Sequence, residues 1–66
     1  MKLKVNGEEH EVPQGVSVTG LLCHLQLSAP RLAVEVNRTL VPRSRHAEHL
    51  LADGDQVEIV TFVGGG

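Results

Sequence analysis

The first dozen residues alternate between polar and apolar side chains, a period of two that is typical of half-buried β-strands. Asn6-Gly7 separates two such runs. Both central residues of a type I′ turn need positive φ, which Asn and Gly adopt most readily. The pattern therefore predicts an antiparallel hairpin over residues 2–12, which Pro13 and Gly15 end.

Apolar residues then recur at the spacing of an amphipathic helix. The apolar stripe consists of Val18, Leu21, Leu22 and Leu25. Ser17 is suited to the N-cap because its hydroxyl can accept a hydrogen bond from a free N–H of the first turn. We therefore expect a helix over residues 18–26, with Gly20 opposite the stripe and Pro30 closing the segment.

Two strands follow the helix. Residues 32–36 alternate between apolar and other side chains, and Asn37-Arg38 is expected to form a tight turn. Residues 39–41 then give a short strand, which Pro42 stops because it has no N–H for a ladder.

The remaining elements complete the architecture. Residues 43–51 are polar with weak helical spacing, which indicates a surface loop with about one helical turn. After the Asp53-Gly54 turn, residues 56–61 alternate again and form the last strand. One amphipathic helix on one face of a mixed sheet of four to five strands is a two-layer α+β arrangement. The order of elements fits a β-grasp with the last strand at its centre.

The last strand leads into a segment without side chains. Val60, Phe62 and Val63 extend the apolar character beyond what one buried face needs, and exposed apolar clusters often mark interfaces. Gly64, Gly65 and Gly66 cannot pack. We divide the chain into a domain over residues 1–62 and a flexible tail over residues 63–66. The tail is either a frayed end or an arm whose carboxylate enters an active site elsewhere.

Composition narrows the class of protein. The net charge of −2 and the single aromatic residue argue against binding nucleic acid through phosphates or base stacking. One cysteine permits no internal disulfide, and no apolar run approaches the length of a membrane span. Met1 leads directly into a strand pattern, with no signal-peptide segment. We expect a reduced, cytoplasmic, soluble monomer that binds no cofactor and no membrane.

Cysteine and histidine offer weak candidates for chemistry. Cys23 lies off the apolar stripe of the helix, and the neighbouring His24 is expected to point elsewhere. We interpret it as a surface residue, although a role in sulfur transfer is an alternative. His46 and His49 could share a metal at helical spacing, but no third ligand is evident, so we interpret both as solvated loop residues.

Charged residues give two further candidates. Arg38, Arg43 and Arg45 form a basic cluster in an acidic chain, which is either ordinary surface charge or a patch that steers an acidic partner. We count Arg43 among the candidate partner-binding residues. Asp53 and Asp55 suggest paired carboxylates, but we favour a turn in which they bond backbone N–H groups.

Four segments in register resemble the ThiS-type sulfur carriers of thiamine biosynthesis. They are Val36-Asn37, Val41-Pro42-Arg43, Asp53-Gly54-Asp55-Gln56-Val57-Glu58-Ile59 and Val63-Gly64-Gly65-Gly66. The resemblance covers essentially the whole chain. The small subunit of molybdopterin synthase shares the Asp-Gly-Asp turn and the Gly-Gly end, but resembles this chain less through Val-Pro-Arg. One departure is His46, near which family members often have an aromatic residue.

The resemblance implies a ubiquitin-like β-grasp that carries sulfur and is not itself an enzyme. In such families an E1-like adenylyltransferase uses ATP to adenylate the terminal carboxylate. A sulfur donor, such as a cysteine desulfurase or a rhodanese-like protein, converts the adenylate to a thiocarboxylate, which delivers sulfur to thiazole synthase. Carried over here, the reacting carbon belongs to Gly66, and Gly64 and Gly65 provide clearance.

Three other functions remain open at this point. The chain could be the small subunit of molybdopterin synthase, whose tail enters a partner's active site. It could be a ubiquitin-like modifier in which Gly66 forms an isopeptide bond. It could also be a plain β-grasp binding domain with an incidental tail.

Overall fold

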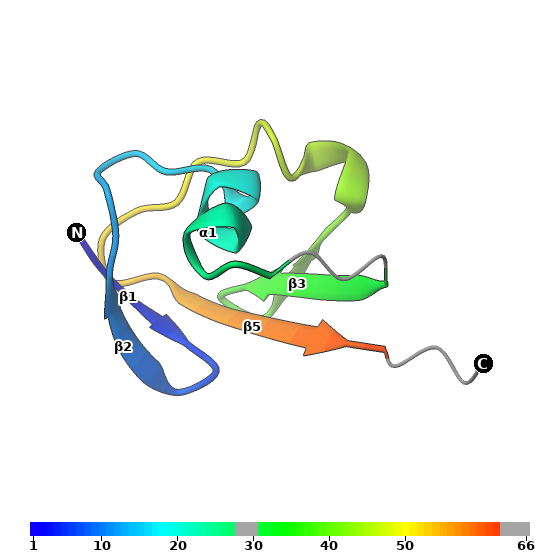
Figure 1. Cartoon of the computed structure of the whole chain (residues 1–66), viewed down its shortest axis with the longest axis horizontal. Coiled ribbons are helices and arrows are strands. Elements are labelled where there is room, and N and C mark those ends of the chain that lie inside the picture. Colours follow the sequence, from blue (N-terminus) through cyan, green and yellow to red (C-terminus); the bar gives the residue numbers. More distant parts are fainter. Residues whose placement is uncertain (28–30, 63–66) are drawn as a thin grey trace.

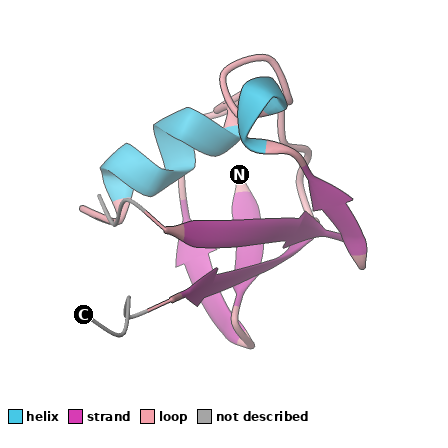
Figure 2. Ribbon diagram, turned by 90° about the vertical axis from the view of Figure 1, so that its right-hand side faces the viewer, coloured by secondary structure: helices cyan, strands magenta, loops and turns pink. Residues whose placement is uncertain are grey.

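A five-stranded mixed sheet carries one helix on one of its faces in the computed structural model, which describes residues 1–27 and 31–62 (Figures 1 and 2). The strands are β1 (Lys2–Val5), β2 (Glu8–Glu11), β3 (Leu32–Val36), β4 (Thr39–Val41) and β5 (Gln56–Thr61). Their order in the sheet is β2-β1-β5-β3-β4. β1 and β5 run parallel, and the other neighbours are antiparallel. The expected β-grasp with the last strand at its centre is confirmed.

The two hairpins turn on pairs of residues with positive φ. Asn6 has φ 50° and Gly7 φ 83°, as the type I′ prediction requires. Asn37 and Arg38 make the second turn with φ 51° and φ 70°. Residues other than Gly and Asn are strained at positive φ. Arg38 keeps this conformation because the paired strands β3 and β4 hold it on either side.

The helix α1 (Val18–His24) begins as the sequence predicts and ends earlier. Ser17 caps it, because its hydroxyl oxygen accepts a hydrogen bond from the Gly20 N–H at 3.0 Å. The expected extension to residue 26 is wrong. Gln26 adopts φ 58°, and the N–H groups of Gln26 and Leu27 donate to the carbonyls of Cys23 and Leu22. This is a Schellman ending built on Gln instead of Gly, so composition did not mark it.

The segment after β4 is more deeply packed than a surface loop. It opens with a 3₁₀-helix, η1 (Arg43–Arg45), which confirms the expected helical turn. His46 and Leu51 are buried, however, so the interpretation of residues 43–51 as a solvated loop is wrong at these two positions. The carbonyls of His46 and His49 accept hydrogen bonds from the first two N–H groups of α1, so the segment completes the cap of the helix.

The core lies between α1 and the sheet. Its apolar members are Leu3, Val5, Val12, Val18, Leu21, Val34, Val36, Val41, Leu51, Val57 and Ile59. In each long strand they alternate with exposed residues, which is the pattern expected when one sheet face is covered and the other is not. The face of the sheet opposite α1 is therefore uncovered, and β5 runs along its middle. Among the described helices, none is long and apolar enough to cross a membrane.

Candidate functional site

β5 divides its side chains between the core and the open face of the sheet. Val57 and Ile59 point inward and are 1% and 7% exposed. Val60 and Phe62 are 51% and 56% exposed. The expectation that apolar residues of this strand remain at the surface is therefore confirmed. β5 also leads directly into Val63, Gly64, Gly65 and Gly66, which lie outside the described residues.

The Asn6 side chain fixes β5 from one side. The backbone ladder between β1 and β5 ends at Val5 and Val57. Beyond it, the Asn6 Nδ2 donates to the Ile59 carbonyl at 3.1 Å, and the Ile59 N–H donates to Asn6 Oδ1 at 2.8 Å. The amide thus takes the place of one more peptide unit in the ladder and holds the middle of β5.

Asn37 and Asp55 fix the start of β5 from the other side. The Gln56 N–H donates to Asn37 Oδ1 at 3.0 Å, and Asn37 Nδ2 donates to Asp55 Oδ1 at 3.0 Å. Asp55 Oδ2 in turn accepts from the Ala52 N–H at 2.8 Å. Asp53 accepts from the Lys2 N–H at 2.7 Å. Both aspartates bond backbone N–H groups, so the predicted turn role is confirmed, and the strand is held at a defined angle to the body.

Strand pairing adds two residues that the sequence pattern did not single out. Ala33 on β3 lies directly opposite Val60. Leu40 on β4 lies opposite Glu35, one outward position from Ala33, and is 59% exposed. We name Ala33, Leu40, Val60 and Phe62 the outer apolar patch. This patch could be found only from the register of the paired strands, because its members come from three different parts of the sheet.

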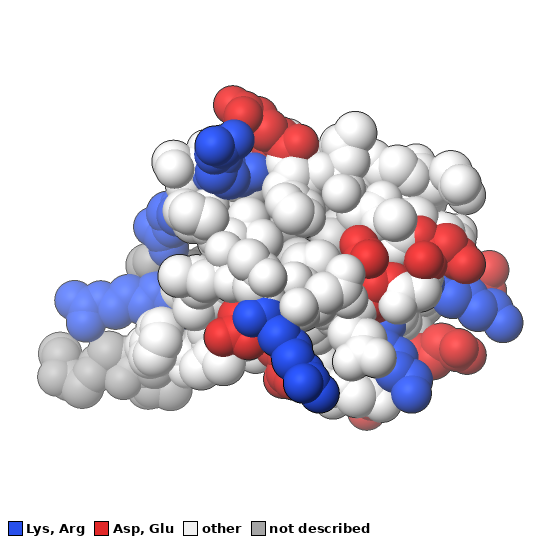
Figure 3. All heavy atoms as spheres, turned by 180° about the vertical axis from the view of Figure 1, so that it is seen from behind, with Lys and Arg blue, Asp and Glu red and all other residues white. Residues whose placement is uncertain are grey.

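Arg43 lies at the start of η1, next in the chain to β4 at the edge of the sheet. Arg43 follows β4, which carries Leu40 of the outer apolar patch, and β3 lies between β4 and the strand that carries Val60. Its part in partner binding stays a prediction. In Figure 3, the Lys and Arg side chains lie close to Asp and Glu side chains, and much of the upper middle of this face is uncharged.

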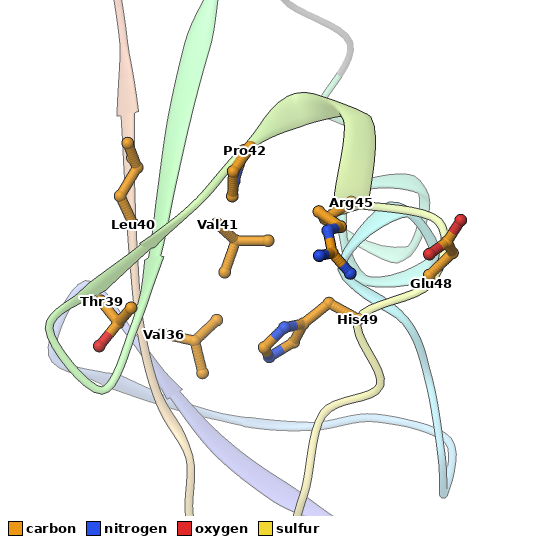
Figure 4. A pocket seen from close by; sticks show the side chains of 8 residues that line it. All are labelled: Val36, Thr39, Leu40, Val41, Pro42, Arg45, Glu48 and His49. Atoms are coloured by element: carbon orange, nitrogen blue, oxygen red, sulfur yellow. The ribbon is translucent and has the colours of Figure 1, made fainter.

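A shallow groove of about 410 Å³ lies beside β4 (Figure 4). Its lining residues are Val36, Thr39, Leu40, Val41, Pro42, Arg45, Glu48 and His49. The Arg45 guanidinium and the His49 ring lie toward the groove, whereas the Glu48 carboxylate points away. Leu40 belongs both to the lining of the groove and to the outer apolar patch, so the groove and the patch adjoin.

His46 does not lie at the surface as the sequence suggested, and His49 is half-buried. His46 is only 6% exposed, and its Nε2 lies 3.0 Å from the Val41 carbonyl. The interpretation of His46 as a solvated residue is wrong, because its ring fills the space below the segment after β4. Across residues 1–27 and 31–62, no three potential ligand side chains come together as a metal site. Cys23 is exposed, as expected from its place off the apolar stripe.

Comparison with known proteins identifies the family. The model of the ThiS family matches residues 2–66. The chain belongs to the ThiS family. The sulfur carrier protein ThiS of Escherichia coli is 30% identical over 66 residues, and the match covers the whole of both chains.

A solved ThiS structure and a longer relative complete the comparison. The crystal structure of the thiamine biosynthesis protein ThiS from Geobacter metallireducens has a TM-score of 0.86 and 36% identity, and each chain is covered fully. This match places the fold with the ubiquitin-like ThiS proteins. A thiazole synthase of Paramagnetospirillum magneticum is 44% identical over the whole of this chain, which spans 20% of that relative's length.

Proposed function

We propose that this ThiS-family chain carries sulfur as a thiocarboxylate on Gly66. An E1-like adenylyltransferase transfers AMP from ATP to the Gly66 carboxylate and releases pyrophosphate. The terminal sulfur of a persulfide on a donor such as a cysteine desulfurase or a rhodanese-like protein then attacks the acyl carbon and displaces AMP. A thiol cleaves the resulting acyl disulfide, which releases the thiocarboxylate and leaves a disulfide between the thiol and the donor. The thiocarboxylate gives its sulfur to thiazole synthase, and the chain acts in the cytoplasm as a carrier and not as an enzyme.

One observation carries the proposal: the chain matches the ThiS family over residues 2–66 and has three glycines, Gly64, Gly65 and Gly66, shortly after the central strand. Adenylation converts a resonance-stabilised carboxylate into an acyl group with a good leaving group. Three residues without Cβ leave the backbone unobstructed, so a narrow active site can close around it. The hydrogen bonds that fix β5 support this role, since they give the segment beyond Phe62 a defined origin.

The choice of acceptor rests on the longer relatives. Two proteins named thiazole synthase contain a stretch that matches this whole chain, at 44% and 39% identity. A carrier and its acceptor in one polypeptide are a natural arrangement for repeated transfer between them, because the tether raises the effective concentration. This observation favours thiazole synthase over the acceptors in the molybdopterin and protein-modifier alternatives.

The decisive experiment is the intact mass of the chain. We expect incubation with ATP, an E1-like adenylyltransferase and a sulfur donor to replace one oxygen by sulfur at Gly66, and thiazole synthase to remove that sulfur. A chain whose mass stays unchanged, although the adenylyltransferase and the sulfur donor are both active, would contradict the proposal. High-mass adducts on other proteins would instead indicate a modifier.

The tail provides a sharper variant. We expect Gly65→Val to abolish thiocarboxylate formation, because a branched side chain clashes in a channel shaped for backbone and restricts φ and ψ. Thermal unfolding should be nearly unchanged, since the residue follows the domain. An equal loss of folding and of activity would show that Gly65 is structural.

A further inference from the structure

β4 ends the sheet, and one of its residues keeps both backbone groups directed outward. In the β3–β4 hairpin, Val36 and Thr39 flank the two-residue turn and form the hydrogen-bonded pair beside it. Such pairs alternate with non-hydrogen-bonded pairs along an antiparallel ladder, so Leu40, opposite Glu35, belongs to the second kind. The Leu40 N–H and carbonyl therefore point away from β3, and no residue of 1–27 or 31–62 bonds them there.

The two edges of the sheet differ in how they are protected. The edge at β2 carries Glu8, Glu9 and Glu11, and charges of this kind resist pairing with a further strand. β4 carries no charge over Thr39–Val41, and Pro42 limits how far pairing can extend. The β4 edge is therefore the one that can accept an extended segment, over a short stretch.

The groove beside β4 lies where side chains of such a segment would enter. The neighbours of Leu40 in the strand point to the helix side of the sheet, where Val41 is 4% exposed. Across the groove, the Arg45 guanidinium and the His49 ring lie toward the same space (Figure 4). In the described part of the chain, no carboxylate pairs with the Arg45 side chain. The groove thus combines an apolar floor with an unneutralised cation.

We propose that the β4 edge and its groove bind an extended, acidic peptide segment of another protein by strand addition. One residue of the segment exchanges two backbone hydrogen bonds with Leu40. Because side chains alternate along a strand, the next residue of the segment points into the groove, where an Asp or Glu carboxylate meets the Arg45 guanidinium. The site lies on the helix side of the sheet edge. It goes beyond the sulfur chemistry proposed for Gly66 and does not depend on it.

The probe is a short peptide with blocked ends that alternates valine and glutamate. It is titrated into the whole isotope-labelled chain and followed by NMR, and we expect the largest shift changes at Leu40 and in the groove. A peptide with lysine in place of glutamate should bind at least about tenfold more weakly, because it brings a cation to Arg45. The net charge of −2 attracts the lysine peptide, so a preference for glutamate reports the groove and not the overall charge.

Methylation of the peptide's backbone nitrogens tests strand addition. When the glutamates face the groove, a valine lies opposite Leu40 and its N–H donates to the Leu40 carbonyl. Methylation of the valine nitrogens should therefore weaken binding about tenfold, whereas the same change at the glutamate nitrogens, which point away, should alter it less than about twofold. Equal effects of the two methylations would show that no strand is added.

A pair of charge variants tests the groove. We expect Arg45→Gln to weaken binding of the glutamate peptide about tenfold and to remove its preference over the lysine peptide. Lys2→Gln removes the same charge from β1, which β5 and β3 separate from β4, and should change binding less than about twofold. Both side chains are exposed, so the Tm of either variant should stay close to that of the parent.

Three results would overturn the inference. The first is equal binding of the glutamate and lysine peptides, and the second is a set of shift changes confined to the open face around β5. The third is self-association of the chain that Arg45→Gln abolishes, because the occupant would then be the acidic β2 of a second copy. Thiocarboxylate formation on Gly66 is measured separately, so none of these results bears on the proposed function.

Discussion

Asn6 meets two requirements at once. Its φ of 50° turns the first hairpin, and its amide forms two hydrogen bonds with the backbone of Ile59 on the central strand. Asn tolerates the left-handed region better than most residues and carries both a donor and an acceptor. A residue that reads as a simple turn signal therefore also positions β5, the strand from which the tail leaves.

The two requirements can be separated by mutation. We expect Asn6→Gly to keep the turn and lose the hydrogen bonds, lowering the free energy of unfolding by about 1–2 kcal/mol. Asn6→Ala should cost about 1 kcal/mol more, because alanine is strained at positive φ. Urea unfolding measures both. Equal stability of Asn6→Gly and the parent would show that the amide contributes nothing to holding β5.

At the scale of elements, α1 depends on its surroundings. With seven residues it is shorter than a helix that is stable alone in water. Its first N–H groups bond the carbonyls of His49 and His46 in the segment after β4, and the Leu51 N–H bonds the Val16 carbonyl. These contacts explain why residues 43–51 are packed and not simply solvated, since the segment caps the helix and covers its start.

Gly20 in α1 is also constrained by its surroundings, because the side chain of Val16 occupies the space beside it. A Cβ at this position would lie 2.6 Å from Val16 Cγ2, closer than real contacts allow. We expect Gly20→Ala to lower the free energy of unfolding by about 1–2 kcal/mol, although alanine is normally about 1 kcal/mol better than glycine inside a helix. Thr19→Ala, at an exposed helical position, is the matched control and should change stability by less than about 0.5 kcal/mol.

A double mutant tests the cause. In a Val16→Ala background the clash is removed, so Gly20→Ala should become neutral or stabilising when unfolding is measured in urea. If the same loss persists there, the contact with Val16 is not what excludes a side chain at this position.

At the scale of the whole molecule, the helix covers one face of the sheet and leaves the other face exposed (Figure 2). The outer apolar patch lies on that open face, next to the segment that follows β5. If the proposed function holds, we expect this surface to be the part of the domain that each partner enzyme contacts.

The patch can be tested against an equally exposed apolar residue elsewhere. We expect Phe62→Asp to weaken binding to the adenylyltransferase about tenfold or more, because a charge would be buried in the apolar contact. Leu50→Asp should leave binding unchanged, since Leu50 is 66% exposed and pairs with Ser17 at the start of α1, not on the open face. Calorimetric titration measures both, and equal losses would argue against a specific patch.

Much of the architecture could be predicted from the sequence. Alternation predicted the strands, Ser17 marked the start of the helix, and Asn6-Gly7 predicted the first turn. The end of the helix was missed because Gln26 takes the place that glycine usually occupies. The burial of His46 was missed because a polar side chain in a polar segment carries no signal until its partner, the Val41 carbonyl, is placed beside it.

By itself, the amino-acid sequence determined which segments form strands, where the helix begins and which residues lack side chains, because period, capping residues and glycine content are local properties. Only the tertiary structure decided which outward residues lie together. Leu40, Ala33 and Val60 come from three strands, and Glu35 meets Glu58 only through the register of β3 and β5. Register depends on the packing of the whole core, so no local pattern contains it.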